Sequence, residues 1–178
     1  HWIACSPCMQ NGVEDRTSGG LLIFVNRATG SEWTWSHTVI VPGRVSMATA
    51  LRDDMRFDLV NVHNFGISPG RMAGVSKKLC ALAKAALSSH GARTFTLCGD
   101  LNICPDGNQP LRLQRPEQIR LSNVEFTTPP AHRYRAGDWR WKAITDLCVE
   151  VDARAHTHLN MRRLTTQSID RIFIACPK

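Results

Sequence analysis

The spacing of hydrophobic residues changes once along the chain, and this change constrains the fold more than any other feature. Before His63 the apolar residues form short runs, as in LLIFV (21–25), or alternate with polar residues, as in SEWTWSHTVIV (31–41). Both patterns are typical of β-strands. From Met72 to Ala86 the apolar residues recur every three or four positions, which predicts an amphipathic helix. Several consecutive strands followed by a helix indicate an α+β fold.

The strands expected before the helix form an antiparallel run. Its last two members, RVSMATALR (44–52) and FDLVNVHN (57–64), flank a short polar turn. The helix that follows has sequence signals at both ends. Ser68 fits its N-cap, Pro69 fits its first position, and Gly91 fits its C-terminal end.

The second half of the chain contains two more strand patterns, TFTLCGD (94–100) and SIDRIFIAC (168–176). Between them, residues 105–130 are polar and proline-rich, and one short helix is expected near residues 116–121. The segment AITDLCVEVD (143–152) fits either a helix or a strand.

The composition is that of a globular protein. The 178 residues are 43% hydrophobic and 21% charged, which suits one domain with a substantial core and argues against disorder. No apolar run approaches the roughly 20 residues of a membrane span, and no signal peptide is visible. Among seven cysteines, Cys80, Cys98 and Cys176 lie within apolar patterns, so we expect a reduced, intracellular protein. Cys5 and Cys8 form a CxxC motif without a second pair, which is weak support for a zinc site.

The net charge is +7 and the pI is about 9.4, which fits a polyanionic partner such as nucleic acid. Basic residues concentrate late in the chain, for example in HRYRAGDWRWK (132–142) and MRRL (161–164). A solvated basic surface explains this charge equally well.

Polar residues lie at the expected ends of three strands. Asp100 and Asn102 follow the apolar strand that begins at residue 94, and His63 ends the strand before the helix. A histidine at a strand end is more often structural than catalytic, so His63 alone indicates little.

Asp170 is the polar residue on the third of these strands. Strand side chains alternate, so Asp170 shares a face with Ile172 and Ile174, which we expect to be core residues. Burying an unpaired charge costs several kcal/mol, and Asp170 should therefore have a partner. That partner is a group in a cleft, a nearby arginine, or the backbone of a loop that Asp170 caps.

Taken in order, NVHN (61–64), a helix, CGDLN (98–102) and SIDRI (168–172) resemble the endonuclease/exonuclease/phosphatase superfamily, whose members include DNase I and the apurinic endonucleases. GGLLIFV (19–25) resembles an early core strand of that family. The resemblance implies a DNase I-like four-layer β-sandwich, in which two mixed β-sheets are flanked by helices. Residues 1–178 would form a single, partial domain of this kind.

Within the superfamily, the chain most resembles the endonuclease domains of non-LTR retrotransposons. THLNMRRLTTQSIDRIFIACP (157–177) resembles the end of those domains, and VPGRVSMATAL (41–51) resembles the segment before their histidine or tyrosine strand. The resemblance implies nucleic acid as partner, with DNA favoured over RNA. It also implies a nuclear location, no membrane association, and a place in a larger polyprotein with reverse transcriptase.

The resemblance also implies roles for four residues. Phosphodiester hydrolysis in this family needs an attacking water, a divalent metal (Mg²⁺ or Mn²⁺) and a group at the leaving oxygen. Asp100 would orient or deprotonate the water and bind the metal. His63 would bind phosphate or protonate the leaving group, and Asn102 would hold a phosphate oxygen or assist the metal site. Asp170 would orient a partner histidine.

Two parts of the family pattern have no convincing counterpart. The family has a strand with a metal-binding glutamate before the GG strand, but the eighteen residues before Gly19 contain only Glu14, in a polar stretch. The Ser-Asp-His motif that follows the family's last strand is also missing. We therefore expect a fold that is incomplete at both ends and a chain that is weak or inactive alone. It is a fragment of a nuclease or a degenerate copy that binds nucleic acid; a phosphatase of the same superfamily is a less favoured alternative.

Overall fold

The structure is a computed structural model. It describes residues 2–7, 9–10, 13–14, 20–26, 28, 31–64, 67–101, 111–113, 126–127, 138–151, 158–160, 165–167 and 170–177. Its strands are β1 (Trp2–Pro7), β2 (Met9–Gln10), β3 (Val13–Glu14), β4 (Gly20–Val25), β5 (Thr34–Val41), β6 (Val45–Arg52), β7 (Met55–His63), β8 (Arg93–Asp100), β9 (Leu111–Leu113), β10 (Phe126–Thr127), β11 (Val149–Val151), β12 (His158–Asn160), β13 (Thr165–Gln167) and β14 (Asp170–Ala175). Its helices are α2 (Pro69–Leu87) and α3 (Asp138–Thr145).

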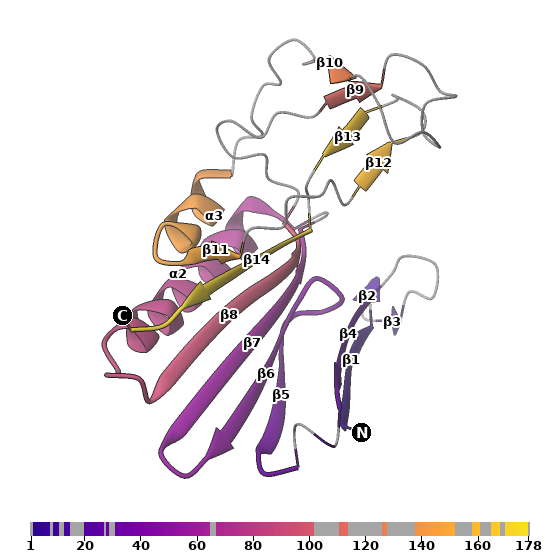
Figure 1. Ribbon diagram of the computed structural model, residues 1–178. Helices are drawn as coiled ribbons and strands as arrows, with labels where there is room; N and C mark the ends of the chain where they lie inside the picture. Colours follow the sequence, from indigo (N-terminus) through magenta and orange to yellow (C-terminus); the bar gives the residue numbers. More distant parts are fainter. Residues whose placement is uncertain are drawn as a thin grey trace.

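A six-stranded sheet forms the centre of the molecule, in the order β11-β14-β8-β7-β6-β5 (Figure 1). Its neighbours are antiparallel except β7 and β8, which are parallel. Parallel strands need a crossover connection, and α2 supplies it. The crossover brings the C-terminal ends of β7 and β8 to the same edge of the sheet.

Helices α2 and α3 lie on one face of this sheet (Figure 1). The apolar face of α2 is buried with the sheet and α3 in one core, which includes Met72, Val75, Leu79, Leu97 and Trp141. Ser68 caps the helix by accepting a hydrogen bond from the Arg71 N–H. The helix predicted from the hydrophobic spacing is therefore confirmed, although it ends at Leu87 and Gly91 lies in the following turn.

A two-stranded antiparallel sheet, β1 with β4, lies on the opposite side of the six-stranded sheet (Figure 1). The buried residues between the two sheets are Ala4, Ile23 and Ala48. Small side chains allow the two backbones to approach, and Trp2 and Trp35 pack at the margin with ring centroids 5.5 Å apart. Two smaller sheets, β10-β9-β13-β12 and β2-β3, complete the described strands.

The predicted α+β class, with two sheets and helices outside, is confirmed, and the described residues form three of the four expected layers. One detail was wrong, and one open alternative is resolved. A strand, β1, lies before Gly19, and residues 21–25 pair with it instead of with residues 31–41. The ambiguous segment 143–152 is both elements, because α3 ends at Thr145 and β11 begins at Val149. The helix expected near residues 116–121 lies outside the described part of the chain.

The core face of β14 is the reverse of the expected one. Arg171, Phe173 and Ala175 are buried against the helices, whereas Asp170 is exposed and Ile172 is 43% exposed. Both faces of this strand carry apolar residues, so alternation alone could not select the buried one. Asp170 therefore does not lie among core residues.

Two other sequence features concern cysteines and membranes. Cys80 and Cys98 are half-buried, but Cys176 follows β14 and is exposed, so it is not a core residue. All cysteines in the described ranges are free thiols. Within those ranges, neither helix has the length and apolar character needed to cross a membrane.

Candidate active site

Three of the four predicted site residues meet at one edge of the six-stranded sheet. His63 at the end of β7 is the Cα partner of Asp100 at the end of β8. Asp100 is in turn the Cα partner of Asp170 at the start of β14. Side chains at paired positions point to the same face, here the face that also carries the β1–β4 sheet. The fourth residue, Asn102, lies outside the described residues.

The three side chains differ in exposure. His63 and Asp100 are half-buried, and Asp170 is exposed. Each of the three also has an interaction partner. The site therefore combines an imidazole and two carboxylates on three adjacent strands, open to solvent on the Asp170 side. The structure thus brings these three residues to adjacent strand ends, and their catalytic roles remain predictions.

A close approach of two backbones positions Asp100. The residue before it, Gly99, has φ of 118°, in the region that favours glycine. A Cβ at Gly99 would overlap the carbonyl oxygen of Val62 and approach the Asn61 Oδ1 to 2.9 Å. Only glycine allows β8 to lie this close to β7, so the glycine of the CGDLN motif has a direct structural reason.

Asn64 anchors the chain around Asp100, and sequence analysis did not identify it. Its backbone N–H donates to the Asp100 carbonyl oxygen at 2.8 Å. Its side-chain Nδ2 donates to the Leu101 carbonyl oxygen at 2.6 Å. Leu101 itself is fully buried. The residue after His63 therefore fastens the end of β8 to the end of β7.

Arg44 is a second site residue that sequence analysis did not identify. It lies in the turn between β5 and β6, and its Nη1 is 3.0 Å from the His63 Nδ1. Its carbonyl oxygen accepts a hydrogen bond from the His63 N–H at 2.8 Å. The only sequence signal was its position in the PGR turn, which does not reveal a contact 19 residues away.

The described residues do not form a metal centre by themselves. Among them, no group of three or more histidine, cysteine, aspartate or glutamate side chains lies close enough to hold a metal ion. Asp100, the predicted metal ligand, has one carboxylate neighbour in register, Asp170. Glu14 lies in the two-residue strand β3, paired with Met9. The described part of the chain thus does not fit a metal site, and Asp100 as a ligand remains a prediction.

Cys98 lies on the same face as Asp100, two residues earlier in β8. Its Sγ lies 3.4 Å from the Val60 carbonyl oxygen, to which the thiol donates. Burial raises the pKa of the Cys98 thiol from 9.0 to about 11. A thiol with this pKa is neutral at physiological pH, and Cys98 packs beside the site.

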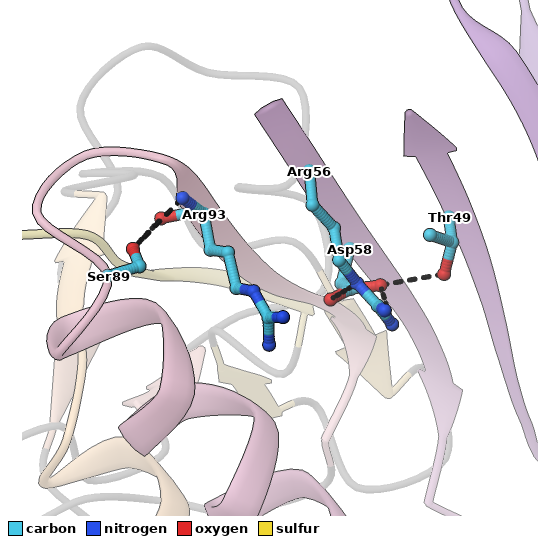
Figure 2. A network of polar contacts seen from close by, with 5 residues as sticks. All are labelled: Thr49, Arg56, Asp58, Ser89 and Arg93. Carbon is cyan, nitrogen blue, oxygen red and sulfur yellow. Dashed lines mark hydrogen bonds and ion pairs between the residues drawn. The ribbon is translucent and has the colours of Figure 1, made fainter. Parts of the chain in front are cut away.

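A second polar cluster lies at the opposite end of β7 and is fully paired (Figure 2). Asp58 is 4% exposed, and its Oδ1 accepts a hydrogen bond from Thr49 Oγ1 at 2.6 Å. Arg56 donates to both carboxylate oxygens of Asp58, at 2.8 and 3.0 Å. The hydrogen bond to Asp58 raises the pKa of Arg56 above its already high value. Because both oxygens of the buried Asp58 carboxylate are paired, this cluster stabilises the sheet.

Comparison with known proteins gives little further information. The sequence matches no protein-family model and is similar to no curated protein. Two solved structures of TDP2 are similar to the chain. Truncated Caenorhabditis elegans TDP2 is 11% identical with a TM-score of 0.43, and the match covers 82% of this chain and 54% of that one. A humanized D. rerio TDP2 is 13% identical with a TM-score of 0.30, with coverage of 83% and 53%. The chain spans about half the length of these structures, and likeness at this level assigns neither a family nor an activity.

Proposed function

We propose that this chain is an endonuclease domain of the endonuclease/exonuclease/phosphatase superfamily that hydrolyses phosphodiester bonds in DNA. One observation carries the proposal: His63, Asp100 and Asp170 occupy paired positions at one sheet edge. Imidazole and carboxylate groups are the side chains that most often transfer protons in hydrolysis. Three neighbouring strands hold these groups more rigidly than loops would.

The proposed roles are those that the resemblance to the superfamily implies. Asp100 is half-buried at a strand end that Gly99 and Asn64 fix, and it would orient or deprotonate the attacking water. His63 would contact the phosphate or the leaving group. Asp170 would orient a partner, and Asn102 would hold a phosphate oxygen.

The proposal includes a requirement for Mg²⁺ or Mn²⁺, which would neutralise the phosphate charge. The described residues do not complete a metal site.

We also propose that the domain comes from a non-LTR retroelement. The support is the likeness of residues 157–177 to the ends of such endonuclease domains. On this proposal the domain acts in the nucleus and belongs to a polyprotein with reverse transcriptase.

The test is nicking of supercoiled plasmid with Mg²⁺, with Mn²⁺ and with a chelator. We expect slow nicking that needs the metal and that falls at least about 100-fold in Asp100→Ala, because proton transfer by one side chain contributes about that much. Asp54→Ala is the matched control, since Asp54 is an exposed acid in the turn between β6 and β7. Equal activity of wild type and Asp100→Ala would contradict the proposal.

Binding of DNA without nicking would favour the second candidate, a degenerate copy that retains only nucleic-acid binding. The net charge of +7 favours that candidate over the phosphatase alternative. Hydrolysis of small phosphate monoesters without plasmid nicking would instead favour a phosphatase.

A further inference from the structure

The backbone of Arg44 is fixed from three sides. Gly43, before it, has φ of 64°, and its N–H donates to the buried Ser6 Oγ of β1 at 2.9 Å. The Arg44 N–H donates to the Val41 carbonyl oxygen at 3.0 Å. The Arg44 carbonyl oxygen accepts the His63 N–H at 2.8 Å. The turn is therefore tied to β1, to β5 and to the last residue of β7.

The side chain of Arg44 then reaches the His63 ring. Its Nη1 lies 3.0 Å from the His63 Nδ1, and both residues are half-buried. A guanidinium has five N–H donors, no acceptor, and stays protonated in proteins. The His63 Nδ1 must therefore accept this hydrogen bond with its lone pair. It follows that the proton of the neutral imidazole is on Nε2.

We propose that Arg44 is a positioning residue that holds His63 in its Nε2–H tautomer. The histidine then has one N–H donor, at Nε2, and the ring is oriented by the bond at Nδ1. A proton on Nδ1 would point directly at the guanidinium, so this arrangement excludes the other tautomer.

The tautomer selects between the two roles proposed for His63. An Nε2–H group donates a hydrogen bond to a phosphate oxygen, which is the phosphate-binding role. Protonation of the leaving group by an imidazolium would instead require a proton at Nδ1 as well, against Arg44. This choice of role rests on the proposed nuclease function, whereas the tautomer does not.

The test is NMR of the ¹⁵N-histidine-labelled chain at about pH 8, where an ordinary imidazole is neutral. Long-range ¹H–¹⁵N spectra distinguish the two tautomers, and His63→Gln assigns the His63 signals. The exposed His90 provides an internal reference for a ring that averages both tautomers in water. We expect wild-type His63 to show the pure Nε2–H pattern.

The variant is Arg44→Met, which keeps an apolar stem and removes the donor. We expect His63 to lose the pure pattern and to move toward the averaged shifts of His90. Arg71→Met is the matched control, because Arg71 is exposed on α2 and its loss removes the same charge. It should leave the His63 spectrum unchanged.

Two results would overturn the inference: a wild-type His63 with its proton on Nδ1, or an unchanged pattern in folded Arg44→Met. If Arg44→Met does not fold, the wild-type spectrum still decides. A chain that shows the Nε2–H pattern but binds DNA without nicking it would favour the degenerate copy over the proposed nuclease and leave this inference intact.

Discussion

At the scale of one residue, Gly99 shows why the position before Asp100 requires glycine. Its φ of 118° is a conformation that residues with a Cβ rarely adopt. A Cβ would also overlap the Val62 carbonyl oxygen, which belongs to the backbone of β7 and cannot move without moving that strand. The backbone strain and the steric overlap are independent of each other, and both would occur next to Asp100.

We therefore expect Gly99→Ala to lower the free energy of unfolding by at least about 2 kcal/mol, from backbone strain and overpacking together. Urea denaturation followed by circular dichroism measures this. Gly74→Ala is the matched control: Gly74 lies within α2, and its added Cβ would meet nothing within 4 Å. The control should stabilise the protein by about 0.5–1 kcal/mol, because alanine is the better helix former. Stabilisation by both changes would contradict the close approach of β7 and β8.

The sequence identified the proposed site residues better than the residues that hold them in place. His63, Asp100 and Asp170 stand out because each is polar at the end of an apolar strand pattern. Arg44 and Asn64 carry no such signal. Their contacts with His63 and Leu101 depend on which turn lies beside which strand end, and that follows only from the sheet order.

At the scale of one element, the edge strand β11 is joined to β14 by an ion pair as well as by backbone pairing. Arg171 is 5% exposed and faces the helices. Its Nε and Nη2 donate bidentate hydrogen bonds to the Glu150 carboxylate on β11. The guanidinium also lies over the Phe173 ring, 4.8 Å from its centroid. The Glu150 side chain is 38% exposed. The arginine thus has far less access to water than its partner.

This difference in exposure predicts that replacing Glu150 and replacing Arg171 have unequal effects on stability. Glu150→Ala leaves a buried guanidinium unpaired and should cost about 2 kcal/mol, less than a fully buried pair because Glu150 is partly solvated. Arg171→Met replaces the charge with an apolar chain and should stay within about 1 kcal/mol of wild type. Thermal and urea unfolding measure both.

Glu32→Ala serves as the control, since Glu32 is 74% exposed in its pair with Arg52. It should change stability by less than about 0.5 kcal/mol. If Arg171→Met proves as costly as Glu150→Ala, the charged contacts of the arginine are themselves stabilising, and the proposed imbalance is wrong.

Elements with a single apolar face were predictable, and those without one were not. In α2 the apolar residues are spaced by three and four positions, so only a helix places them all on one face. The helix is found where it was expected. β1 was missed because its inward residues, Ala4 and Ser6, are small and one is polar. The buried face of β14 was misjudged because Ile172 and Phe173 are both apolar, and only α2 and α3 decide which is covered.

At the scale of the whole molecule, the net charge of +7 predicts electrostatic attraction to a long polyanion. Contacts of lysine and arginine with phosphates release counterions, so such binding weakens as salt rises. This term does not depend on base sequence. The charge therefore predicts an affinity that is general for nucleic acids.

We expect binding to a fluorescent DNA duplex, measured by anisotropy, to weaken at least about tenfold between about 50 and 200 mM salt. Duplexes of unrelated sequence should bind alike. An uncharged peptide–nucleic-acid duplex is the control and should not bind. An affinity that is constant across this salt range would argue against a phosphate-dominated surface.

The pairing of β14 with β8 leaves no room for slippage. Moving β14 by one residue would turn Arg171 away from the helices and bury Ile172 in its place. Moving it by two residues would keep the same faces but carry Asp170 about 7 Å away from Asp100. A one-residue shift would therefore disrupt the core, and a two-residue shift would disrupt the proposed site. The alignment that fills the core with Phe173 and Ala175 is also the one that sets Asp170 beside Asp100. Selection for burial of the Arg171, Phe173 and Ala175 face would thus keep Asp170 on the same face as Asp100 without acting on the proposed site directly.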